Sequence, residues 1–69
     1  MKFIQYLPAG IMYAPVLPEV GEVVEVEDHG KATVKRLYHT THQNYIELTF
    51  EDVLTEEKTY SFKFEALTT

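Results

Sequence analysis

The chain has 69 residues, no cysteine and a formal net charge of −5. A chain of this length forms a single domain, residues 1–69, which buries only about 60% of its unfolded surface and gains little stability from its core. Without cysteine no disulfide can support the domain, and its acidic balance disfavours nucleic acid as a partner, because affinity for a phosphate backbone comes largely from lysine and arginine.

The first predicted element is a short strand at residues 2–7, which carries apolar side chains on both faces. Gln5, Pro8 and Gly10 interrupt this apolar run before it could form the core of a signal peptide. No segment of the chain approaches the length of a membrane span. We therefore expect a cytoplasmic protein that does not contact a membrane.

Residues 8–21 are predicted to form a long ordered loop. They contain all three prolines and two of the three glycines, and each proline removes a backbone donor and fixes φ, which disfavours a regular sheet ladder. The apolar residues of this loop either pack on the barrel or form an exposed patch for a partner, and the small size of the domain favours packing. These residues are Ile11, Met12, Tyr13, Val16 and Leu17.

A hairpin is predicted next, with strands at residues 22–27 and 32–39 around a turn at 28–31. The first of these strands is rich in β-branched valine, which favours extended backbone. Gly30 is available for the positive φ that such a turn requires.

The second strand of this hairpin changes its parity along its length. Val34 and Leu37 would face opposite sides of a regular strand, and a β-bulge near Lys35-Arg36 would bring both to the core. Residues 40–43 are polar and are predicted to form the turn into the next strand.

The clearest strands are residues 44–50 and 59–65, in which large apolar and polar side chains alternate with a period of two. Residues 51–57 link them and are predicted to include one capped helical turn. Together the elements predict an all-β fold, a small five-stranded antiparallel barrel with a long Pro/Gly loop after the first strand. A five-stranded open sheet or a sandwich-like fragment would show nearly the same alternation.

Residues 18–24, Pro-Glu-Val-Gly-Glu-Val-Val, resemble the Pro-x-x-Gly-x-x-Val opening of the SH3-like small barrels, a superfamily that includes Tudor-like and KOW-like modules. Ala32-Thr33-Val34 adds to this resemblance, which covers about residues 18–66. It implies an SH3-like barrel. The chain lacks tryptophan, so the tryptophan-based groove for proline-rich peptides in true SH3 domains has no counterpart, and no aromatic cage is identifiable.

A four-strand meander places the turn at 28–31 and the link at 51–57 at the same end of the sheet, because consecutive antiparallel strands reverse direction. That end is acidic and would suit a basic partner, or would mimic a phosphate backbone. The simpler interpretation is a solvated surface that maintains solubility. Its acidic residues are Glu27, Asp28, Glu51, Asp52, Glu56 and Glu57.

The opposite end of the sheet carries cationic and aromatic residues that would serve a nucleic-acid-binding barrel. These residues are Lys35, Arg36, Tyr38, His39 and Tyr45. His39 and His42 are also three positions apart, but a closed metal site needs further ligands that the sequence does not supply, so we predict no metal site.

No catalytic constellation is visible in the chain. Ser61, the only serine, is predicted to face away from the core on an open sheet surface, where no cleft is implied. We therefore expect that the protein is not an enzyme and binds no cofactor. We expect it to be a monomer or a weak homodimer.

The main hypothesis is a non-catalytic protein–protein interaction module, such as a small accessory or inhibitor protein, that docks on an unidentified protein partner through the 8–21 loop or the acidic end. The alternative hypothesis is a small-barrel nucleic-acid-binding protein.

Overall fold

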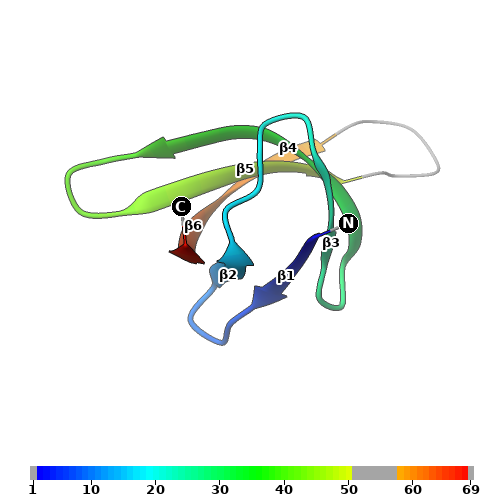
Figure 1. Cartoon of the computed structure of the whole chain (residues 1–69), viewed down its shortest axis with the longest axis horizontal. Coiled ribbons are helices and arrows are strands. Elements are labelled where there is room, and N and C mark those ends of the chain that lie inside the picture. Colours follow the sequence, from blue (N-terminus) through cyan, green and yellow to red (C-terminus); the bar gives the residue numbers. More distant parts are fainter. Residues whose placement is uncertain (1, 51–57, 69) are drawn as a thin grey trace.

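Six strands close into a β-barrel in the computed structural model, which describes residues 2–50 and 58–68 (Figure 1). The predicted strand at residues 44–50 is confirmed with the same bounds. The strands are β1 (Lys2–Tyr6), β2 (Ile11–Val16), β3 (Val23–Val26), β4 (Gly30–His39), β5 (Asn44–Phe50) and β6 (Lys58–Thr68).

The barrel follows the order β1-β2-β6-β5-β4-β3, with β3 to β6 as an antiparallel meander. The predicted antiparallel barrel is corrected at two places, because β1 pairs with β3 and β2 pairs with β6 in parallel. Ile4 lies opposite Val26, and Met12 lies opposite Phe64. These two parallel ladders close the barrel and remove the free edges of a simple meander.

The predicted loop at 8–21 contains a strand, β2, and this raises the strand count from five to six. A tight turn precedes β2, in which the Gly10 amide donates to the Leu7 carbonyl over 2.9 Å, with Gly10 at a φ of +80°. Pro15 does not prevent the strand. The register of β1 with β2 runs through Tyr6↔Met12 to Gln5↔Tyr13 and therefore stops before the proline.

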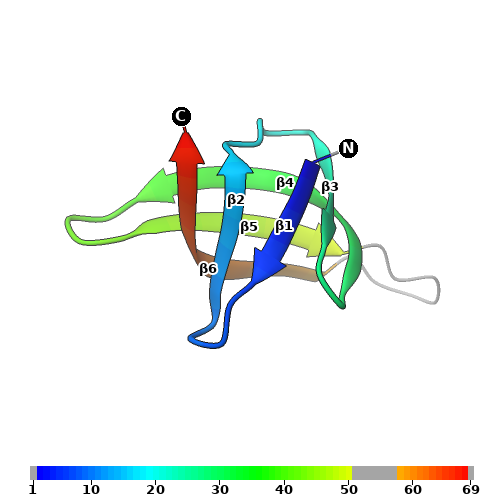
Figure 2. The same cartoon turned by 60° about the horizontal axis from the view of Figure 1, so that its bottom comes forward.

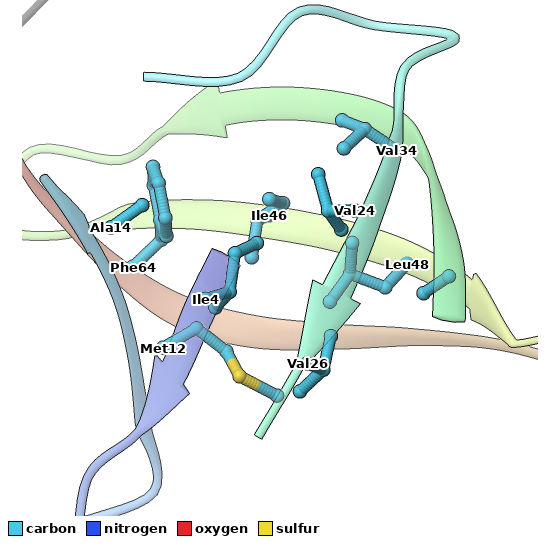
Figure 3. Packing of buried hydrophobic residues seen from close by; sticks show 10 residues of the cluster. Ile4, Met12, Ala14, Val24, Val26, Val34, Ile46, Leu48 and Phe64 are labelled. Carbon is cyan, nitrogen blue, oxygen red and sulfur yellow. The ribbon is translucent and has the colours of Figure 1, made fainter. Parts of the chain in front are cut away.

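Side chains from all six strands meet in the barrel interior (Figure 3). β2 contributes Met12 and Ala14, which are 0% and 1% exposed, so most of its inward surface belongs to the core. The full core comprises Ile4, Met12, Ala14, Val24, Val26, Ala32, Val34, Ile46, Leu48 and Phe64.

The bulge predicted in β4 is confirmed, since Val34 pairs with Leu48 while Arg36 pairs with the adjacent Glu47. Leu37 thereby returns to the inner side and packs against the core. Beyond this point the β4–β5 hairpin projects from the barrel past β2 and β6 (Figure 2). The projection helps to give the molecule its extents of 36 × 24 × 21 Å.

The second turn of the meander has its predicted position at 40–43, whereas the first occupies 27–29 instead of 28–31, because β4 begins at Gly30. Gly30 adopts a φ of +87°, as predicted for the first turn, and Asp28 adopts +63°. In the second turn the Thr40 amide donates to the Gln43 carbonyl over 2.8 Å. The helical turn predicted within 51–57 lies outside the described residues.

Candidate interaction surfaces

A mostly apolar depression of about 300 Å³ lies on the outer side of β1 and β2. Phe3 precedes the buried Ile4 and therefore faces outward. Tyr13 lies between the buried Met12 and Ala14 and faces outward for the same reason. We call this surface the β1–β2 face. Its depression is lined by Lys2, Phe3, Gln5, Tyr13, Pro15 and Val16.

Four of the five apolar residues proposed from the sequence as loop contacts belong to the core or to this surface. Met12 is wholly buried, so a partner cannot reach it, and Leu17 is half-buried against the core. Val16 is 50% exposed, and Ile11 and Tyr13 are half-buried. Tyr13 and Val16 are therefore the two of the five that line the depression.

One cation at the rim of the depression is held in place by neighbouring acceptors. Lys2 Nζ lies 3.2 Å from the Leu17 carbonyl oxygen and 3.2 Å from Glu22 Oε1. The Glu19 amide donates to Glu22 Oε1 over 2.9 Å, and this hydrogen bond, assisted by Lys2, lowers the pKa of the Glu22 carboxyl from its ordinary value. The lysine is thus paired, and the rim presents little uncompensated charge.

The acidic end is described in part. Asp28 is exposed in the first turn of the meander, and Glu27 is half-buried beside it, with its amide donating to the Ile4 carbonyl over 2.8 Å. Glu51, Asp52, Glu56 and Glu57 lie outside the described residues.

The outer face of β4, β5 and β6 brings together three of the five residues proposed for nucleic-acid binding. The Tyr38 and Tyr45 rings stack with centroids 5.1 Å apart and an interplanar angle of 12°. The Arg36 guanidinium carbon lies 4.2 Å from the centroid of the Tyr38 ring, a cation–π distance. The Tyr38 and Ser61 hydroxyls share a hydrogen bond of 2.7 Å, and Ser61 is exposed, as predicted.

The remaining two residues of that proposed set, Lys35 and His39, lie on β4 but outside the ring stack. Lys35 is exposed at the bulge, next to Arg36, whose Nη2 pairs with Glu47 Oε2 over 2.8 Å. His39 has the opposite parity to Tyr38 and lines a depression between the hairpin and the barrel, together with Leu37, and the edges of Tyr38 and Tyr45 also border this depression. The structure therefore supplies an aromatic stack with one paired cation rather than a continuous basic patch.

Five rings cluster at the end of the barrel that carries the first meander turn, and sequence reasoning missed this group. Tyr6 lies 5.1 Å from His29 and 6.1 Å from Phe62, measured between ring centroids. Phe50 and Tyr60 lie 6.5 and 6.3 Å from Phe62. The shared parity of Phe50, Tyr60 and Phe62 was visible in the sequence, but their meeting with Tyr6 and His29 depends on barrel closure.

Residues 2–50 and 58–68 contain no group of three or more histidine, cysteine, aspartate or glutamate side chains arranged to hold a metal ion. Within the same range there is no helix with the length and apolar character needed to cross a membrane.

Comparisons with protein-family models, curated proteins and solved structures gave no match to this chain. The surfaces described above therefore carry the functional argument.

Proposed function

We propose that the protein is a non-catalytic protein–protein interaction module that docks through the β1–β2 face. The observation that carries this proposal is the apolar depression, beside which Phe3 and Val16 remain 46% and 50% exposed. Tyr13 and Pro15 add a ring and a rigid pyrrolidine to the same depression. Aromatic rings and a fixed proline offer contact area with little loss of side-chain entropy, which favours association.

The shape of this surface suits a protein partner better than a small ligand. Small-molecule sites enclose most of the ligand surface, whereas this depression lies open on the outer side of two strands. An apolar side chain projecting from a partner would fill it, and the paired Lys2 at its rim would remain hydrated.

The proposed relationship to the SH3-like barrels is supported by the roles of three residues in the opening motif. Pro18 is almost completely buried, Gly21 has a φ of +91°, and Val24 is 0% exposed in the core. The proline and the valine are thus packing residues, and the glycine permits a backbone conformation that other residues rarely adopt. The parallel pairing of β2 with β6 is an addition to the five-stranded pattern.

A pull-down with matched surface variants tests the interaction. A double substitution, Phe3→Ser with Val16→Ser, removes the apolar rim of the depression, whereas Val20→Ser changes a valine that is 62% exposed outside it. We expect the double variant to recover at least about tenfold less of any partner than the wild type, the loss typical of two well-buried contacts, and V20S to recover the same amount. Circular dichroism establishes that both variants are folded. Equal recovery by the folded double variant contradicts the proposal.

Single-stranded nucleic acid is the second candidate, favoured specifically by the stacked Tyr38 and Tyr45. A base stacked on the Tyr45 ring would contribute about 1–3 kcal/mol to binding, so Tyr45→Ala should weaken it. Tyr60→Ala, in the ring cluster around Phe62, should leave binding unchanged. Fluorescence anisotropy with a labelled mixed-sequence oligonucleotide at about 50 mM and about 200 mM salt measures this. Absence of binding at low salt, or binding that ignores salt, rejects this candidate.

A further inference from the structure

The far half of β4 has a neighbour on one side only. β5 pairs with β4 as far as His39, but the register with β3 ends at the pair Val23↔Thr33. Two backbone hydrogen bonds extend this side slightly, from the Gly21 amide to the Val34 carbonyl (2.7 Å) and from the Val34 amide to the Glu22 carbonyl (2.9 Å). Among the described residues no backbone bond reaches β4 on this side beyond Val34, and Figure 1 shows this stretch as the margin of the projecting hairpin.

The open side presents backbone groups at two residues. In an antiparallel pair, hydrogen-bonded and non-hydrogen-bonded residue pairs alternate. The Thr40 amide bonds to the Gln43 carbonyl, and alternation from this bonded pair makes Tyr38↔Tyr45 the next bonded pair. Leu37 and His39 belong to the non-bonded pairs, so their N–H and C=O groups point away from β5. Counting from the barrel gives the same result. Val34 bonds away from β5, so Val34↔Leu48 is a non-bonded pair, and after the bulge Arg36↔Glu47 is the next bonded pair. Four backbone groups therefore form a short open edge.

A depression of about 260 Å³ adjoins this edge on the inner side of the hairpin. Leu37 and His39 belong to both the edge and the depression. The rest of its lining comprises Leu17, Tyr38, Asn44, Tyr45, Phe64 and Ala66. A strand that paired with the edge would direct alternate side chains to this side, so the depression would receive an apolar side chain from it.

The outer side of the same edge carries two cations, of which Arg36 is paired with Glu47. Lys35 and Arg36 are both exposed there, with the Arg36 side chain 59% exposed despite its pairing with Glu47. The chain as a whole carries a charge of −5, whereas Lys35, Arg36 and Glu47 together leave one positive charge beside this edge. A second copy would set its own Lys35 and Arg36 near this edge, whereas an acidic segment would meet complementary charge.

We propose that the edge of β4 at Leu37 to His39 binds an extended acidic peptide segment of another protein by β-augmentation, with one apolar side chain in the adjoining depression. Backbone hydrogen bonds to Leu37 and His39 supply the pairing. Lys35 and Arg36 attract the acidic side chains on the outer side. This edge is separate from the β1–β2 face, so either site can fail its test without affecting the other.

The probe is a seven-residue peptide, Glu-Val-Asp-Leu-Glu-Val-Asp, compared with a basic analogue and with an analogue N-methylated at alternate amides. We expect the acidic peptide to bind saturably, at least about tenfold more tightly than either analogue at low salt, because the analogues lose the charge match or the backbone donors. Hydrogen exchange by NMR should show new protection at the Leu37 and His39 amides and no change at Tyr38, which already bonds to β5.

A matched pair of variants isolates the backbone contribution. His39→Ala keeps the edge amide, whereas His39→Pro removes it without breaking a hydrogen bond to β5. We expect H39A to bind within about threefold of the wild type and H39P to bind at least about tenfold less tightly. Equal binding of the N-methylated peptide, absence of binding by the acidic peptide, or protection of Leu37 and His39 by self-association without peptide would each overturn the proposal. The exchange measurement on the wild-type chain decides the matter even if H39P does not fold.

Discussion

Met12 and Val16 lie on the same strand, but their truncation should change the free energy of unfolding by very different amounts. Met12 is 0% exposed among the core residues, whereas Val16 is 50% exposed at the end of β2. Deleting buried methylene groups removes both transfer free energy and packing contacts, while truncating an exposed side chain removes little of either. The contrast follows from β2 being part of the barrel rather than a surface loop.

We therefore expect Met12→Ala to lower the free energy of unfolding by about 2–5 kcal/mol and Val16→Ala to change it by less than about 1 kcal/mol. Urea titration followed by tyrosine fluorescence measures both values. Similar small effects for the two variants would show that β2 does not contribute to the core.

Glu22 makes part of the stability of the domain dependent on pH. Its folded-state pKa lies below the ordinary value of 4.5, chiefly because its carboxylate accepts the Glu19 amide hydrogen bond and also because it pairs with Lys2. A lowered folded pKa gives stability that is fully present above the unfolded pKa and is lost as the pH falls through the folded pKa.

The expected result is that wild type is more stable than Glu22→Gln at pH 7, and that this difference shrinks as the pH falls below about 4.5. Thermal unfolding of both proteins between pH 7 and pH 3 measures the difference. Glu65→Gln, which alters an exposed carboxylate on β6, is the control. A difference that stays constant with pH would contradict the role given to Glu22.

At the scale of the element, the bulge of β4 determines which side chains reach the core. Val34 is buried and Leu37 is half-buried, with two exposed residues between them instead of one. Both Lys35 and Arg36 can therefore remain in water while the strand continues along the barrel. A regular strand would force one of these cations toward the apolar interior.

Deletion of Lys35 should accordingly leave a cooperative barrel, because Val34, Arg36 and Leu37 then alternate regularly opposite β5. Deletion of Leu37 should abolish cooperative unfolding or lower stability severely, because either Arg36 or Tyr38 would have to occupy its inward position. Guanidinium titrations of the two deletion variants make the comparison. Equal stability of the two would show that the register is not set by the bulge.

Some strands and contacts of the barrel could be predicted from the sequence, and others could not. Alternation was sufficient to predict β5 with its bounds, and the parity change between Val34 and Leu37 was sufficient to predict the bulge. β2 was missed because Pro15 suggested a loop, and only the closed topology shows that the β1 ladder stops before this proline. The ring cluster around Phe62 was missed because parity tells which face a side chain occupies but not which distant strands close over it.

At the scale of the whole molecule, the barrel is closed by pairings between distant parts of the chain. β1 with β3 and β2 with β6 are both parallel, and Met12↔Phe64 joins the first quarter of the sequence to its last. Contacts of such long range usually make folding slow, and we expect refolding in milliseconds to seconds in stopped-flow fluorescence. Complete refolding within microseconds would be inconsistent with a barrel closed in this way.

The outer surfaces of this small barrel differ in chemical character. The β1–β2 face is apolar, the bulge of β4 carries Lys35 and the paired Arg36, and the rings around Phe62 occupy the end with the first meander turn. The barrel interior is filled by its own side chains, so outer surfaces are available for recognition. In our proposal the β1–β2 face is the principal docking site.

Photo-crosslinking in cells tests that proposal most directly. Phe3 and Tyr60 are 46% and 47% exposed on different parts of the barrel, so benzoylphenylalanine placed at either position is equally accessible. Our proposal predicts a discrete protein adduct after irradiation of the Phe3 variant and none from the Tyr60 variant. An adduct from position 60 with none from position 3 would contradict docking through the β1–β2 face.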